Sequence, residues 1–288
     1  MFVRAPAKII ISGEHSVVYG HRALCAAINK YTKLKIYPNT SNSIELRWGN
    51  DWHEILDLNQ NDSKSYLAQV AHILNIKPSI IEVNSEVPSS SGLGSSASFA
   101  VALSRAMNGS IQQAIEIENI FHGKRGSGLD VQVTNHGGIC LFQIGKSVQQ
   151  IDLPIQNILL IDSGDRKQKG TQGSIAKVKN SVELKDGKQI LDRISEVTES
   201  IIKEGLVKEL IYENHDLLDR LGICTDRIND IIRICKKQSI PAKMTGAGDG
   251  GFCIAFPQDE QQSNFLIQQL QNYKTLKATI DYEGCKLI

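Results

Sequence analysis

The sequence has no excess of charge of either sign: 32 lysines and arginines stand against 31 aspartates and glutamates, a formal net charge of +1 over 288 residues. A surface that binds nucleic acid or an anionic membrane needs a basic patch, and this balance gives no sign of one. With 41% hydrophobic and 22% charged residues, the composition is that of an ordinary globular protein of one or two domains. A small polar ligand is therefore the expected partner.

Paired cysteines and long apolar stretches are also missing. The six cysteines form no C-x-x-C pair, which argues against a zinc site or a disulfide framework and predicts reduced thiols in the core. No stretch reaches the roughly 18 apolar residues of a membrane-spanning helix, and the opening "MFVRAPAKIIISGEH" lacks the apolar core of a signal peptide. These features predict a cytoplasmic protein.

The hydrophobic pattern alternates between strands and helices. Short runs rich in β-branched residues predict strands at 8–12, 34–38, 44–48, 80–83, 139–144 and 158–162, and later at 251–256 and 278–282. Apolar residues three and four apart predict helices over 67–74, 99–106 and 190–201. A polar segment after residue 161 predicts two lobes, 1–155 and 156–288, and an α+β fold.

A further helix is predicted around 111–122, and it carries an unusual carboxylate. Ile111, Ile115, Glu118 and His122 fall on one side of this helix. Glu118 would therefore point the same way as residues that should face inward. His122 is expected to pack or to form a hydrogen bond, because no second histidine or cysteine lies at metal-ligand spacing.

The segment "EVPSSSGLGSSASFAVAL" follows a predicted strand and opens a predicted helix. Glycines let the backbone approach an anion, and the first turn of a helix offers free N–H groups and the positive end of the helix dipole. The segment therefore predicts a phosphate cradle, in which serine hydroxyls can donate hydrogen bonds or coordinate Mg²⁺. Its cofactor-binding residues would be Pro88, Ser90, Ser91, Gly92, Leu93, Gly94, Ser95 and Ser96.

Three common motifs account for this segment less well. A serine-capped helix after a flexible turn is the simplest of them, but it does not explain the density of glycine. The G-K-[ST] ending of a Walker loop is missing. "GLGSSA" fits G-x-G-x-x-A, yet the acidic residues about 20 positions on lie in a helical pattern and not at the end of a strand, as a dinucleotide-binding fold requires.

A second segment, "KMTGAGDGGFCIAF", has four glycines within six residues and leads into an apolar strand. The helix of a dinucleotide-binding motif is therefore absent. The two glycine segments, although far apart in sequence, could close on one ligand. Asp249 lies among these glycines, and its carboxylate would repel a phosphate unless it points away or pairs with a cation.

With "APAKIIISGEHSVVYG", "VPSSSGLGSSAS" and "KMTGAGDGGFC" in this order, the chain resembles the GHMP kinases over its whole length, and "GEHSVVYG" is most similar to the motif of the mevalonate kinases. The resemblance implies an N-terminal S5-like α/β domain that binds nucleotide and substrate, and a C-terminal ferredoxin-like α+β domain. It also implies ATP and Mg²⁺ as cofactors, mevalonate as substrate, a role in isoprenoid biosynthesis and a homodimer.

The same resemblance implies roles for individual residues. Asp130, in "HGKRGSGLD", would be the catalytic base, with Lys8 as its cationic neighbour, and Ser96 and Glu118 would bind Mg²⁺. The substrate would meet Glu14, His15, Thr171, Gly246 and Ala247, with Val17 and Val18 packing behind the first two. These implied roles agree with the chemistry of phosphoryl transfer, which needs an anion cradle, a carboxylate-held Mg²⁺ and a base.

Three alternatives stay open from the sequence. Lys124 and Arg125 could meet an already phosphorylated acceptor, which would make the protein a phosphomevalonate kinase. A nucleotide-binding sensor of the same fold would be expected to have lost the base or the Mg²⁺ ligands, yet both are present. Lys8 and Asp130 could also form a purely structural ion pair.

Overall fold

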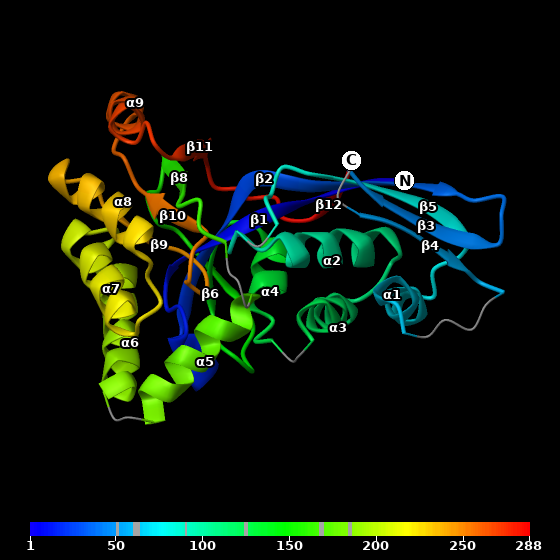
Figure 1. Ribbon diagram of the computed structural model, residues 1–288, viewed down its shortest axis with the longest axis horizontal. Coiled ribbons are helices and arrows are strands. Elements are labelled where there is room, and N and C mark those ends of the chain that lie inside the picture. Colours follow the sequence, from blue (N-terminus) through cyan, green and yellow to red (C-terminus); the bar gives the residue numbers. More distant parts are fainter. Residues whose placement is uncertain (50–51, 60–63, 90, 124–125, 167–169, 184–185) are drawn as a thin grey trace.

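The computed structural model describes the chain except for residues 50–51, 60–63, 90, 124–125, 167–169 and 184–185, and for the side chains of 170–172. Two sheets, each with helices packed on it, lie along the length of the molecule (Figure 1). The first sheet has the order β12-β1-β2-β5-β3-β4, with β6 on β2 and β7 on β6. Its strands are β1 (Phe2–Ser12), β2 (Ala23–Pro38), β3 (Ser43–Trp48), β4 (Trp52–Asp57), β5 (Ser79–Ser85), β6 (Ile139–Phe142), β7 (Gln149–Ile151) and β12 (Lys286–Leu287).

Strand β1 runs through the middle of the protein. From Ala5 to Ser12 every residue is buried, because both faces of the strand are covered, and apart from Lys8 and Ser12 this part of the strand is apolar. The pairing with β2 shifts register between Pro6 and Ala7, where proline has no N–H to donate to the ladder. Four helices pack on one face of this sheet: α1 (Tyr66–Leu74), α2 (Ser95–Ala106), α3 (Ile111–His122) and α4 (Leu129–His136) (Figure 1).

The second sheet is antiparallel, with the order β11-β8-β10-β9. Its strands are β8 (Ile158–Asp162), β9 (Ala242–Met244), β10 (Phe252–Ala255) and β11 (Lys274–Ala278). Its helices are α5 (Gly170–Glu183), α6 (Asp186–Glu204), α7 (Lys208–Arg220), α8 (Asp226–Lys237) and α9 (Glu260–Gln269). Strand β8, the helices α5 to α8, then β9, β10, α9 and β11 form an expanded βαββαβ unit, the ferredoxin-like arrangement.

The two halves share one core. Ile9 and Ile11 of β1 belong to the same hydrophobic cluster as Leu159 and Ile161 of β8. The last strand, β12, also returns to pair with β1. The domain boundary near residue 155, between β7 and β8, therefore stays a prediction.

The predicted helices are confirmed as α1, α2, α3 and α6. The strand predicted at 278–282 is wrong, because β11 ends at Ala278 and only Ile280 forms an isolated bridge, to Ile28. The Asp281 carboxylate instead accepts hydrogen bonds from the backbone of residues 283 and 284, which turns the chain. Among the described residues, every helix is too short or too polar to cross a membrane.

Candidate active site

The two glycine-rich segments lie against each other. The amide of Phe252 donates to the carbonyl of Ser91 at 3.2 Å. A Cβ on Gly251 would lie 2.5 Å from the same carbonyl oxygen, and a Cβ on Gly246 would lie 3.0 Å from the carbonyl oxygen of Gly92. The backbones thus meet where a side chain would separate them. A ligand shared by the two segments stays a prediction.

The first segment ends at the N-terminus of α2. Its N-cap, Gly94, has a left-handed backbone with φ of 79°, and no side chain in the described part of the chain caps the helix. The first N–H groups of α2 are thus available to an anion. Leu93 is buried in the core and contributes only backbone to this region. Ser90 lies outside the described residues.

Lys8 and Asp130 form an ion pair beside this helix end. The Lys8 ammonium, on a side chain that is 2% exposed, lies 3.1 Å from Oδ1 of Asp130 and donates to the carbonyl of Gly92 at 3.0 Å. Asp130 lies in the first turn of α4, and its side chain is 30% exposed. A Cβ on Gly94 would come within 3.0 Å of the Lys8 side chain. Three segments therefore bring an ammonium, a carboxylate and an uncapped helix end together.

Glu118 lies close enough to this pair for the charges of both residues to affect the pKa of its carboxyl. Burial raises the pKa of its carboxyl to about 8, the negative charge of Asp130 adds to that shift, and Lys8 opposes it. One turn further along α3, Nε2 of His122 forms a hydrogen bond with Oγ of Ser96 at 3.0 Å. The helix α3 therefore places Glu118 near Lys8 and Asp130 and directs His122 toward the start of α2. The sequence predicted that His122 would either pack or form a hydrogen bond, and it forms a hydrogen bond.

These oxygen atoms suit Mg²⁺. Carboxylate and hydroxyl oxygens are the hard ligands that Mg²⁺ prefers, and a divalent cation would offset the repulsion between Glu118 and Asp130. In the described part of the chain, no group of three histidine, cysteine, aspartate or glutamate side chains could hold a metal ion. One or two carboxylates are enough where Mg²⁺ keeps waters and nucleotide phosphates as its other ligands.

Glu14 forms a buried ion pair. Its carboxylate pairs through Oε1 with the ammonium of Lys243, on β9, and both side chains are 0% exposed. Burial raises the pKa of the Glu14 carboxyl, and the charge of Lys243 opposes that shift. The other oxygen, Oε2, is buried without a hydrogen-bond partner among the described residues. A substrate that meets Glu14 would therefore find Oε1 already engaged.

His15 follows with a left-handed backbone, φ 60°, and its Nε2 lies 3.0 Å from the carbonyl oxygen of Ala247. Two predicted substrate residues from opposite ends of the sequence thus contact each other. Val17 is buried as predicted, whereas Val18 is 49% exposed, so its expected packing is wrong. The short helix η1 (Ser16–Tyr19) turns Val18 outward.

The carboxylate of Asp249 points to α5. Its Oδ1 lies 2.5 Å from the ammonium of Lys177, and its Oδ2 accepts a hydrogen bond from Ser174 at 2.8 Å. Both partners lie on α5, so Asp249 has the cation that its place among the glycines requires. The repulsion expected from the sequence is thereby relieved.

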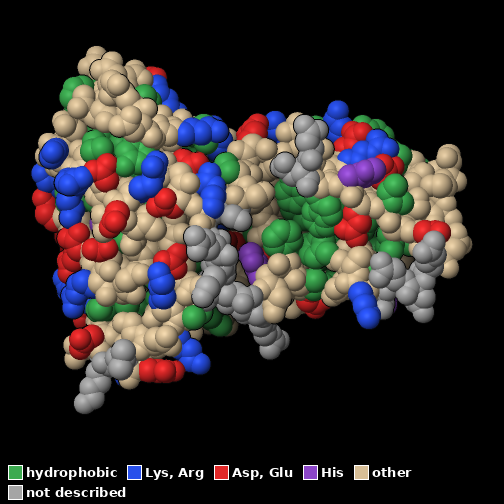
Figure 2. Space-filling view, viewed as in Figure 1, with side chains coloured by type: hydrophobic (Ala, Val, Ile, Leu, Met, Phe, Trp, Pro, Cys, Tyr) green, Lys and Arg blue, Asp and Glu red, His purple; other side chains and the backbone are tan. Residues whose placement is uncertain are grey.

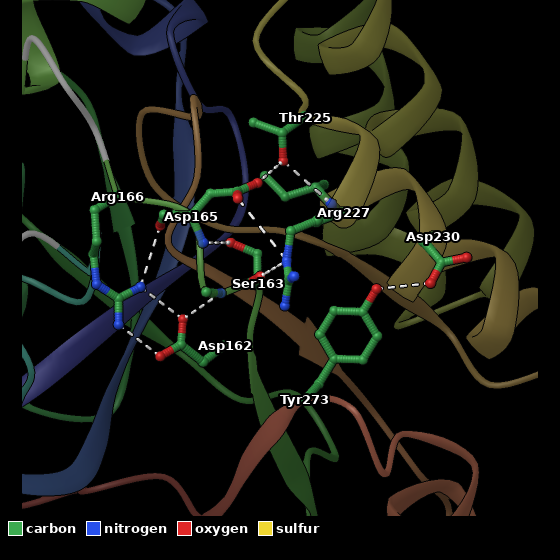
Figure 3. Close-up of polar contacts among 10 residues, drawn as sticks. Asp162, Ser163, Asp165, Arg166, Thr225, Arg227, Asp230 and Tyr273 are labelled. Atoms are coloured by element: carbon green, nitrogen blue, oxygen red, sulfur yellow. Dashed lines mark hydrogen bonds and ion pairs between the residues drawn. The ribbon is translucent and has the colours of Figure 1, made fainter.

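The segment after β8 is fixed to α8 (Figure 3). Arg166 donates to both oxygens of Asp162, Thr225 donates to Asp165 at 2.6 Å, and Arg227 donates to the carbonyl of Ser163. The carbonyl of Asp165 also accepts from the amide of Gly251 at 3.1 Å, which connects this segment to the second glycine segment. The segment leads toward Thr171, whose side chain lies outside the described residues, as do Lys124 and Arg125.

Three residues around the site were not predicted from the sequence: Lys243, Ser174 and Lys177. Lys243 carries the clearest signal, since it stands between Ala242 and Met244 in a strand that should be buried. A charged side chain in such a place needs a partner of opposite sign. Figure 2 shows a hollow between the two halves of the molecule on one face. The uncapped start of α2 and the ion pair of Lys8 and Asp130 form a site with anion-binding and proton-accepting groups.

The comparisons with known proteins agree with this class of site. The family model described as "GHMP kinases N terminal domain" matches residues 63–138, and the model "GHMP kinases C terminal" matches residues 199–275. The chain belongs to the GHMP kinases, and it is an ATP-dependent small-molecule kinase.

Its relatives within the family carry a more specific name. The mevalonate kinase of Archaeoglobus fulgidus is 30% identical over 291 residues, which cover 93% of this chain and 96% of the relative. That of Methanocaldococcus jannaschii is 28% identical, covering 94% and 96%. A crystal structure of mevalonate kinase matches with a TM-score of 0.83 at 25% identity, covering 98% of this chain and 100% of the other.

Proposed function

We propose that this kinase transfers the γ-phosphoryl group of ATP to the primary hydroxyl of mevalonate, giving 5-phosphomevalonate for isoprenoid biosynthesis. The main support for the proposal is the ion pair of Lys8 and Asp130, which lies beside the uncapped start of α2. The names of the relatives support mevalonate as the acceptor, because the similarity extends over nearly the whole of each chain.

Asp130 acts as the base and Lys8 as its cationic neighbour. The Asp130 carboxylate accepts the proton of the attacking hydroxyl, and the ammonium 3.1 Å away stabilises the negative charge that develops on the hydroxyl oxygen. Because phosphoryl transfer proceeds through a loose transition state, the placement of these groups matters more than the strength of the base. The rigidity of the buried Lys8 therefore contributes directly to the rate.

The start of α2 receives the phosphates of ATP. Its free N–H groups and the glycines before it bind phosphate oxygens, and Ser96 and Glu118 are the residues that would hold Mg²⁺. The ion would supply positive charge to offset the negative charge of the phosphate oxygens. The hydrogen bond between His122 and Ser96 fixes the orientation of the serine hydroxyl.

Mevalonate binds on the side of the site formed by Glu14, His15, Thr171, Gly246 and Ala247. The contact between His15 and Ala247 supports this assignment, because it brings two of these segments together. A cytoplasmic location and a homodimer are parts of the same proposal.

The test is ADP release by the purified protein with MgATP, offering mevalonate, phosphomevalonate, galactose and homoserine separately. We expect turnover with mevalonate alone. Asp130→Asn should lower kcat at least about 100-fold while ATP still binds, since removal of a general base costs about 10²–10⁴. Asp152→Asn, at an exposed aspartate after β7, is the matched control and should behave like the wild type.

Two outcomes would contradict the proposal. Turnover with phosphomevalonate alone would assign the acceptor to the phosphorylated compound and direct attention to Lys124 and Arg125. ATP binding without turnover on any of the four acceptors would indicate a sensor.

A further inference from the structure

The ammonium of Lys243 is buried in the centre of the protein. Its side chain is 0% exposed, it pairs with Glu14, and it also donates to the carbonyl of Met244 at 2.6 Å. A buried ammonium is costly unless a carboxylate and further hydrogen bonds compensate it. This pair joins residues 229 positions apart in sequence, one after β1 and the other on β9.

Lys243 belongs to a row of contacts between these two segments. Thr245 accepts a hydrogen bond from the amide of Ile10 at 2.8 Å and donates to the carbonyl of the same residue at 3.1 Å. Ala247 contacts His15 through its carbonyl at 3.0 Å. We call Lys243, Thr245 and Ala247 the β9 row; they are alternate residues, the first on β9 and the other two just after it, and each contacts the segment from Ile10 to His15.

The β9 row contacts a segment whose backbone needs support. A non-glycine residue in the left-handed region, as His15 is, persists only where its surroundings hold it there. Lys243 fixes the residue directly before it, and Ala247 contacts its side chain. The pairing also leaves Oε2 of Glu14 as the one oxygen of that carboxylate without a partner among the described residues.

We propose that Lys243 is a positioning residue for phosphoryl transfer. Its buried ammonium orients Glu14 and the turn at His15, so the acceptor side of the site takes its binding shape only when β9 is in place. This inference rests on the proposed function, since it assigns Glu14 and His15 to the acceptor side.

The test compares Lys243→Met, Glu14→Gln and the double variant in four measurements: KM for mevalonate, KM for ATP, kcat and Tm. Each single variant should lower Tm, because it removes one partner of a buried ion pair, and the double variant should recover most of that loss. KM for mevalonate should nevertheless stay at least tenfold raised in the double variant, while KM for ATP stays within twofold of the wild type. Lys236→Met, which removes a surface pair with Asp216, is the matched control and should change none of these values.

The double variant keeps the proposal falsifiable even if a single variant fails to fold. A wild-type KM for mevalonate in a folded double variant would show that Lys243 is structural only and would overturn the inference. Equal rises in both KM values would do the same, because they would indicate general distortion of the site. A wild-type protein without turnover on any acceptor would instead refute the proposed function, and the inference with it.

Discussion

Gly94 has no side chain, and this leaves space for Lys8 in the centre of the site. Its φ of 79° lies in the left-handed region, and a Cβ there would be 3.0 Å from Cγ and 3.2 Å from Cε of Lys8. Lys8 cannot yield easily, because its side chain is buried and bonded to Asp130 and to the carbonyl of Gly92. Glycine is therefore required for two separate reasons, backbone conformation and space.

Gly94→Ala should lower kcat/KM at least tenfold, because the new methyl group displaces Lys8 from Asp130. The left-handed backbone alone should cost about 1 kcal/mol of stability. Gly145→Ala is the matched control: Gly145 has the same φ of 79°, but a Cβ there would meet no atom of the described residues within 4 Å. Steady-state kinetics and chemical denaturation of both variants check this. Equal activity in the two would disprove the steric part of the argument.

At the scale of residues, local patterns in the sequence predicted some groups and missed others. The helical period alone placed Glu118 facing inward, and it is buried. Resemblance to the family pointed to Lys8 and Asp130, and the structure brings these two together. The place of Lys243 in a buried strand indicates that it needs a partner, but the sequence does not identify Glu14 as that partner, because no local pattern reports a pairing across 229 positions.

At the scale of elements, α5 supplies the charge that Asp249 needs. The ion pair of Lys177 and Asp249 is partly exposed, with side-chain exposures of 53% and 22%, so it should contribute less than about 1 kcal/mol to stability. Its effect on a nucleotide phosphate nearby should be larger, because an unpaired carboxylate among the glycines repels it.

Lys177→Met should therefore raise KM for ATP severalfold with little change in Tm. The double variant Lys177→Met/Asp249→Asn should bring KM back toward the wild-type value, since the repelling charge is gone. Lys179→Met, at an exposed lysine on the same helix, serves as the control. If the double variant were no better than Lys177→Met, repulsion by Asp249 would not be the cause.

The packing of α7 on its neighbours should make stability depend on pH. Burial lowers the pKa of His215 from 6.5 to about 4, with the charge of Lys243 adding to the shift. Asn229 and Asp216 act in the opposite direction, and Lys236 adds slightly to the lowering. Between these two pKa values the unfolded chain binds the proton and the folded protein does not. This contribution to stability is therefore complete above pH 6.5 and is lost as the pH falls toward 4.

We expect the free energy of unfolding to fall by up to about 1.4 kcal/mol per pH unit in this range, from His215 alone. His215→Gln should flatten the slope between pH 6.5 and 4, whereas His72→Gln, at an exposed histidine on α1, should leave it unchanged. Urea denaturation at four pH values measures the slope. Identical slopes in the wild type and His215→Gln would contradict the assignment.

Helices were easier to predict than strands for a physical reason. The four residues Ile190, Ile194, Val197 and Ile201 are all buried, and their spacing alone shows the helix. Strand β4 was missed because it lies at the edge of its sheet and exposes His53 and Ile55, so its pattern does not separate apolar from polar residues. Strand β1 was found only in part, because a proline and an arginine interrupt its first half.

At the scale of the whole molecule, the end of the chain completes the first sheet. Strand β12 pairs with Val3 and Arg4, the amide of Ile288 donates to the carbonyl of Phe2 at 2.9 Å, and Cys285 is buried in the core of the first half. The two ends of the chain accordingly lie close together (Figure 1). The order of the sheet, with β12 at its edge, could not be read from the sequence, because two residues are too few to show a strand pattern.

Deletion of residues 285–288 should lower the free energy of unfolding by about 2 kcal/mol, the cost of exposing one buried side chain and the edge it covers. The site lies elsewhere, so kcat of the folded fraction should stay near the wild-type value. Ile288→Ser keeps the backbone hydrogen bond and should cost little, because this side chain is 51% exposed. Chemical denaturation measures the difference, and equal stability of the deletion and the wild type would count against the role of β12.

The pairing of β1 with β12 also affects the order in which the protein folds during synthesis. The ribosome makes β1 long before β12, because the other strands of both sheets lie between them in the sequence. Until β12 emerges, the outer edge of β1 has unpaired N–H and C=O groups and can pair with a strand of another nascent chain. The first sheet is thus begun with β1 and is completed only when β12 has left the ribosome.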